Sequence, residues 1–215
     1  MNTALGERFG TGLLSQAAAM IYTLLAVGLL TLVTAGPGLV LLVFLDRDAS
    51  NLPLAALGVL PAGPALSAAI YALDRRRLDL TDLHPGAAFL RGYWLNAAGA
   101  LKVWGLWLLV VTPNLADPGV PQLIVIAGAT LWMLNALVIT SLFVFRFRDV
   151  ARLSAYLMIR LFGVTVSNAC LIVVALAVVW LWSEAALALA VSLLVVALLG
   201  NARPLVAVVR KEFVA

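Results

Sequence analysis

The chain has 215 residues, of which 64% are hydrophobic and only 11% are charged, and its mean hydropathy is +1.10. Soluble domains carry about 25% charged residues, and a soluble fold of this size cannot bury so many Leu, Val and Ala side chains. The composition excludes a soluble domain and predicts a single all-α bundle in a lipid bilayer. The net charge of +4 does not indicate nucleic-acid binding, because the arginines follow apolar segments instead of forming a stripe on a soluble surface.

The first apolar segment carries no charge between Phe9 and Leu45. A membrane crossing needs about 20 helical residues, so this segment is too long for a simple crossing. We expect the crossing to end at Gly36-Pro37-Gly38, near residue 35, because proline interrupts helices. Residues 39–45 then form either an extension or a short segment that returns to the interface.

Five further crossings follow along the chain. Ser183-Glu184 is the only break between the last two, so they are expected to form a tight antiparallel hairpin. The six predicted spans are 13–35, 53–73, 93–112, 121–145, 161–182 and 185–202.

The distribution of basic residues supports six spans with both termini on one side. Twelve basic residues then lie on that side and Arg47 alone lies opposite, which by the positive-inside rule predicts a multi-pass protein of the cytoplasmic (inner) membrane with cytoplasmic termini. The twelve are Arg8, Arg75, Arg76, Arg77, Arg91, Arg146, Arg148, Arg152, Arg160, Arg203, Arg210 and Lys211.

Pro61 and Pro64 interrupt the second span. Each removes a backbone donor, and in lipid the freed carbonyls need partners inside the protein. This part of the span is therefore expected to face the bundle, with its small residues allowing close helix contact. The break is either a discontinuous helix that lines a substrate site, as in many transporters, or a packing kink.

Two groups of residues form recognisable patterns. The first is Leu60, Pro61, Gly63, Pro64, Ala65, Ala68, Ala69 and Tyr71, and the second is Phe89, Arg91, Tyr93, Asn96 and Trp104. Together these patterns resemble the YesL-like family of uncharacterised bacterial membrane proteins. The resemblance covers about 35 residues, and the sequence departs from it at Gly36-Pro37-Gly38 and over residues 39–59. Because members are often encoded beside carbohydrate-uptake and glycan-degradation genes, the resemblance implies a role connected with sugar uptake. It supplies no catalytic residues.

Lys102 is the most prominent polar residue predicted inside a span. A charge at that depth is costly unless it is paired, hydrated or extended toward the interface, so Lys102 either binds a ligand or reaches the cytoplasmic interface through its long stem. Asn amides either bind sugar hydroxyls or join helices, and Trp rings either stack on sugars or pack. The candidate substrate-binding residues are Lys102, Asn96, Asn135, Trp104, Pro61, Gly63 and Pro64.

Two basic groups are candidates for contact with anionic lipid or a partner protein. Arg75, Arg76 and Arg77 end the second span. Arg148, Arg152 and Arg160, with Tyr156, recur every four residues and predict one face of a helical extension between spans four and five.

No metal or other cofactor is predicted, since Asp79, Asp82 and His84 form the only small group of ligand types. Walker A and hydrolase motifs are absent from the sequence, and Cys170 is expected to be a small buried residue. The sequence favours a non-enzymatic component of solute, in particular carbohydrate, uptake. Transporter subunits or a second copy are possible partners. The alternative is a membrane scaffold whose arginine-rich cytoplasmic face binds a partner or anionic lipid.

Overall fold

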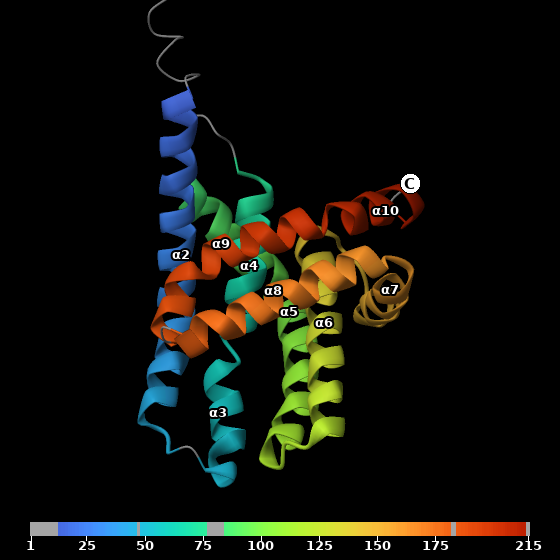
Figure 1. Cartoon of the computed structure of the whole chain (residues 1–215). Coiled ribbons are helices and arrows are strands. Elements are labelled where there is room, and N and C mark those ends of the chain that lie inside the picture. The colour runs from blue at the N-terminus through green and yellow to red at the C-terminus, as the bar shows by residue number, and fades with distance from the viewer. Residues whose placement is uncertain (1–12, 47, 77–83, 182–183, 214–215) are drawn as a thin grey trace, which may run out of the picture.

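The computed structural model describes residues 13–46, 48–76, 84–181 and 184–213, and these are helical with no strand among them. The order of helices is shown in Figure 1. Their bounds are α2 Leu13–Phe44, η1 Ala49–Asn51, α3 Leu52–Val59, α4 Ala62–Asp74, α5 Pro85–Ala116, α6 Val120–Leu142, α7 Phe147–Arg160, α8 Phe162–Leu181, α9 Glu184–Asn201 and α10 Arg203–Phe213.

Helix α2 does not end at Gly36-Pro37-Gly38, so the expectation that proline interrupts the helix there is wrong. The helix continues through Pro37 to Phe44, and residues 39–44 form the extension that the sequence left open. Gly38 lies where this extension packs against α3. A Cβ at Gly38 would lie 1.6 Å from the carbonyl oxygen of Gly58, so the backbones of α2 and α3 touch here and the missing side chain is what permits it.

The predicted second span consists of two helices, α3 and α4, with a break at Leu60-Pro61. The expectation that the second half faces the bundle is confirmed, because α4 is buried from Gly63 to Leu73 except at Leu66. Small residues make this possible: Ala65, Ala68 and Ala69 are completely buried, which lets α2, α5 and α6 approach the α4 backbone closely.

Helices α5 and α6 form an antiparallel hairpin beside α4. Helix α5 begins at Pro85, where proline's missing N–H is tolerated, and it extends beyond both ends of the predicted span 93–112. Helix α6 ends at Leu142, three residues before the predicted end of span 121–145, because Phe143 is extended at φ −132° and ψ 150°.

The segment after α6 is a separate amphipathic helix, α7, rather than an extension of a span. Helices α8 and α9 then pack together as the predicted hairpin. Figure 1 shows that this hairpin runs across the direction of α2, α5 and α6. The last predicted span, 185–202, is followed by a bend of 51° into α10, a second amphipathic helix that the sequence analysis missed.

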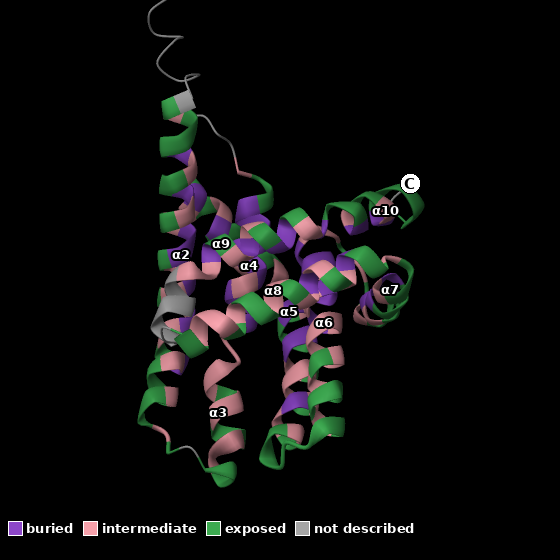
Figure 2. Cartoon of the chain, in the orientation of Figure 1, coloured by how far each residue is buried: buried purple, intermediate pink, exposed green. Residues whose placement is uncertain are grey.

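Among the described residues, five helical segments are long and apolar enough to cross a membrane, and six if Ala190–Asn201 of α9 and α10 count as one broken span. Buried residues gather where α4, α5, α6 and α9 meet, whereas α3 has no buried residue (Figure 2). Large apolar side chains cover the outside, among them Leu109, which is 75% exposed. This is the surface expected of a multi-pass membrane protein, whose outer side chains contact lipid.

Cys170 is exposed on α8, so the expectation that it is buried is wrong. Helix α8 is apolar on all sides, and only Val164 and Asn168 along it are buried. A uniformly apolar pattern does not indicate which side of a helix is exposed. Cys170 lies on the exposed side of α8.

Candidate functional site

The break between α3 and α4 is filled by Trp104 of α5. A Cβ at Gly63 would lie 2.5 Å from the indole Cγ, so the ring packs directly on the glycine. The indole Nε1 donates to the carbonyl oxygen of Val59 at 3.1 Å. The backbone N–H of Gly63 donates to the carbonyl oxygen of Leu60 at 3.4 Å. In a continuous helix this N–H would donate to the carbonyl oxygen of Val59. The indole of Trp104 supplies a donor to that carbonyl instead.

The break therefore has the contacts of a packing kink. Gly63 and Pro64 are buried and Pro61 is half-buried. Trp107 and Trp132 are also engaged within the bundle, since their indole N–H groups donate to Thr130 Oγ1 and to the carbonyl of Ala151, each at 3.1 Å. These tryptophans join helices in this structure.

Asn135 lies in a buried chain of three amides. The Nδ2 of Asn168 on α8 donates to Asn135 Oδ1 on α6 at 3.1 Å, and the Nδ2 of Asn201 on α9 donates to Asn168 Oδ1 at 3.3 Å. Asn135 is 2% exposed and Asn168 is 0% exposed. The chain connects the α8–α9 hairpin to the central bundle, because an amide surrounded by apolar side chains needs a polar partner.

The structure brings two of the predicted substrate-binding residues together. Lys102 and Asn96 line one hollow of about 370 Å³ between α5, the end of α6 and the start of α7. Arg146 and Thr140 complete its polar lining, and Phe143 and Phe147 are among its apolar walls. We call this hollow the Lys102 pocket. Lys102 is exposed, and Asn96 donates from Nδ2 to the carbonyl of Ser141 at 3.1 Å, which fixes α5 against α6.

A second hollow, of about 340 Å³, lies at the N-terminal end of α5, between α2, α4 and α5. Its cationic lining consists of Arg75, Arg76 and Arg91, with His84 beside them. We call it the arginine pocket. Gly92 makes it possible: a Cβ there would lie 2.8 Å from Tyr71 Cδ1, so α5 rests directly on the Tyr71 ring and Arg91 is brought beside α4.

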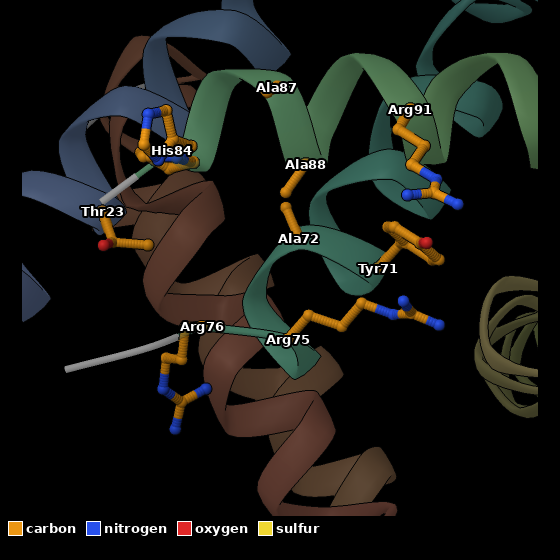
Figure 3. A pocket seen from close by; sticks show the side chains of 10 residues that line it. Thr23, Tyr71, Ala72, Arg75, Arg76, His84, Ala87, Ala88 and Arg91 are labelled. Atoms are coloured by element: carbon orange, nitrogen blue, oxygen red, sulfur yellow. The ribbon is translucent and has the colours of Figure 1, made fainter. Parts of the chain in front are cut away.

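The guanidinium groups of the arginine pocket are held by neutral partners. Arg75 lies 4.4 Å over the Tyr71 ring, and Arg76 Nη1 donates to the carbonyl of Leu73 at 2.9 Å. Both contacts suit cations at the C-terminus of a helix, where carbonyls are left without partners. Figure 3 shows Arg75 and Arg91 on the two sides of Tyr71, with Arg76 directed away from them. Among the described residues, no carboxylate forms an ion pair with these three arginines.

The predicted basic face of residues 148–160 is confirmed as one exposed side of α7. Arg148, Arg152, Tyr156 and Arg160 are all exposed, whereas Val150, Leu153 and Leu157 face the bundle. Arg160 forms a bidentate pair with Glu212 of α10, at 2.6 and 2.8 Å. This pair and its hydrogen bonds lower the pKa of Glu212 and raise that of Arg160.

The remaining predicted residues have mixed outcomes. Arg77, Asp79 and Asp82 lie outside the described residues. The sequence identified Arg91 as a topological marker and as a residue of the family resemblance, but it did not indicate Arg91, Arg146 or Thr140 as site residues. One signal in the sequence was the Arg91-Gly92 dipeptide before two aromatic residues. A glycine within a helix allows a neighbouring helix to pack closely, and Arg91 next to it then lies beside that neighbour.

No family model matches the chain, and no similar curated protein or solved structure was found. The resemblance to the YesL-like family therefore stays a prediction that rests on the residues named for it.

Proposed function

We propose that this protein is a non-enzymatic integral membrane protein that binds anionic lipid headgroups at the cytoplasmic surface through the arginine pocket. This is the alternative in which a membrane scaffold binds anionic lipid through an arginine-rich cytoplasmic face. The observation that carries it is the set of Arg75, Arg76 and Arg91 around one hollow, with no described carboxylate paired to them.

The spread of the three guanidinium groups supports lipid phosphates over a single small ion. Arg75 and Arg91 flank Tyr71 and Arg76 points elsewhere (Figure 3), so they are suited to neighbouring headgroups rather than to one chelated anion. Planar guanidinium groups recognise phosphate oxygens in pairs. Anionic lipids of the cytoplasmic leaflet contribute about 1 kcal/mol for each nearby basic residue.

The amphipathic helices α7 and α10 support the same surface. Their apolar sides are buried at Leu157 and at Leu205 and Val209, while their arginines are exposed. Basic residues on the exposed side of such helices can face anionic headgroups. The proposal puts α7, α10 and the arginine pocket on the cytoplasmic side of the cytoplasmic membrane, with both termini.

Native mass spectrometry of the full chain released from mixed phosphatidylglycerol and phosphatidylcholine tests the proposal. The wild type is expected to retain phosphatidylglycerol preferentially, and a variant carrying R75Q, R76Q and R91Q is expected to lose that preference. A variant carrying R203Q, R210Q and K211Q removes the same charge from α10, outside the pocket, and is expected to lose less of the preference than the first variant does. Equal retention by the wild type and the first variant would contradict the proposal.

The Lys102 pocket favours a second candidate, a component of solute uptake, because two predicted ligand residues share one hollow there. A role in carbohydrate uptake rests on the family resemblance. This second candidate predicts that a neutral sugar at millimolar concentration raises the melting temperature of the wild type but does not raise that of Lys102→Ala. No shift with any sugar of a panel would remove this candidate and leave the lipid proposal intact.

A further inference from the structure

The Lys102 pocket has a lining that differs from that of the arginine pocket. Lys102 comes from α5 and Arg146 from the residue before α7, and both are exposed at the same hollow. Among the described residues neither cation is ion-paired, although Asp149 follows Arg146 within one helical turn. Two unneutralised cations around one hollow favour an anionic occupant.

Thr140 adds an independent observation. Its Oγ1 is buried and has no hydrogen-bond partner. Thr23, Thr31 and Thr130 each donate instead to the carbonyl four residues back, at 2.7–2.8 Å. A buried hydroxyl without a partner is unfavourable, and Thr140 is one of the residues that line the pocket. A ligand oxygen that reaches Thr140 would supply the missing partner.

The rest of the pocket is apolar. Phe143, Phe145 and Phe147 lie on the segment that leads from α6 into α7, and Leu95 and Val150 also line the hollow. The Phe143 and Phe145 rings lie 5.9 Å apart. An anionic group would supply a counter-charge to both cations, and an alkyl or aryl group joined to it would be buried favourably against these rings.

We infer that the Lys102 pocket binds an organic anion in which a phosphate or carboxylate is joined to an apolar group. The anionic head lies between Lys102 and Arg146 within reach of Thr140 Oγ1, and the apolar part lies along the phenylalanines. A membrane lipid and a free amphiphilic metabolite both offer this chemistry. The inference does not depend on headgroup binding at the arginine pocket, since the two sites share no residue.

The direct test measures the melting temperature of the purified full chain in an uncharged maltoside detergent against hexyl phosphate concentration. The wild type is expected to be stabilised, and the apparent affinity is expected to fall about tenfold in K102M and in R146M, which each remove one charge-assisted hydrogen bond. Thr140→Val, of nearly the same shape, is expected to weaken binding several-fold. Arg152→Met removes an equivalent charge from the exposed side of α7 and is expected to bind as the wild type does.

Three outcomes would overturn the inference. These are no stabilisation of the wild type, the same stabilisation of K102M and wild type, and an equal response to inorganic phosphate, which has no apolar part. Repeating the titration in nanodiscs containing phosphatidylglycerol separates the two sources. Loss of the hexyl phosphate response there identifies a lipid as the occupant, and persistence of the response identifies a free organic anion.

Discussion

Trp104 and Gly63 form the contact that holds the broken second span against α5. The indole ring occupies the position of the missing glycine side chain, with Cγ 2.5 Å from where a Cβ would be. Its Nε1 donates to the Val59 carbonyl at 3.1 Å. One residue pair thereby fills the space at the proline break and satisfies a backbone group that a broken helix exposes in a membrane.

Gly63→Ala is expected to lower the free energy of unfolding by about 1–3 kcal/mol, because the added methyl group overlaps a rigid ring. Gly105→Ala, at the residue after Trp104, is the matched control. A Cβ there meets nothing within 4 Å, so the replacement is expected to be neutral or to stabilise the helix by up to about 1 kcal/mol. Denaturant titrations in mixed micelles measure both, and equal effects of the two variants would contradict the packing described.

The contact between α2 and α3 is expected to depend on Gly38. Gly38→Ala forces the two backbones apart, since its Cβ would lie 1.6 Å from the Gly58 carbonyl oxygen, whereas a Cβ at Gly36 meets nothing within 4 Å. The melting temperature is therefore expected to fall in G38A and to stay close to that of the wild type in G36A. If G36A is as unstable as G38A, the site is sensitive to helix flexibility rather than to the contact.

Asn168→Leu tests the buried amide chain with a side chain that has the same branching but no polar atoms. The replacement leaves Asn135 Oδ1 and Asn201 Nδ2 without the partners that they have at 3.1 and 3.3 Å, so a loss of about 1–3 kcal/mol in the free energy of unfolding is expected. Asn114→Leu is the control, because Asn114 bonds only to the carbonyl of Val110 on its own helix, at 2.7 Å. An unchanged stability of N168L would show that the chain does not hold the hairpin.

The ion pair between Arg160 and Glu212 predicts a pH dependence at the α7–α10 contact. Because the pair lowers the pKa of Glu212 below its ordinary value of 4.5, its contribution is present above about pH 4.5 and is lost as the pH falls through the lowered pKa. The contribution is small, since both side chains are about two-fifths exposed, at 40% and 37%. The melting-temperature difference between wild type and Glu212→Gln is expected to vanish in acid. A difference that is independent of pH would contradict the ion pair.

Hydropathy and charge predicted the class of fold because both depend on the solvent and not on neighbouring residues. The apolar helices and the α8–α9 hairpin followed from segment lengths. The path of α2 through Pro37 was not predictable, since it depends on Gly38 meeting Gly58, two residues far apart in the sequence. Helix α10 was missed because its alternation of charged and apolar residues carries no membrane signal, although its amphipathic pattern was present in the sequence.

The candidate sites were predicted only in part, for a similar reason. Lys102 and Asn96 were identified as polar residues in an apolar helix, and the structure puts them at one hollow. Their neighbours Arg146 and Thr140 come from the end of α6 and the turn after it, and no sequence pattern fixes how far α6 extends. Trp104 was assigned to a ligand because an aromatic ring that fills a proline break cannot be distinguished from a free one without the fold.

Sidedness is the most direct test of a membrane-spanning bundle with its basic surface in the cytoplasm. Asp74 beside the arginine pocket and Asp117 at the α5–α6 turn are both exposed and lie at opposite ends of the α4–α5–α6 assembly. With Cys170→Ser as background, a membrane-impermeant maleimide is expected to label D117C only in intact right-side-out cells and D74C only in inverted vesicles. Labelling of both cysteines from the same side would contradict the account.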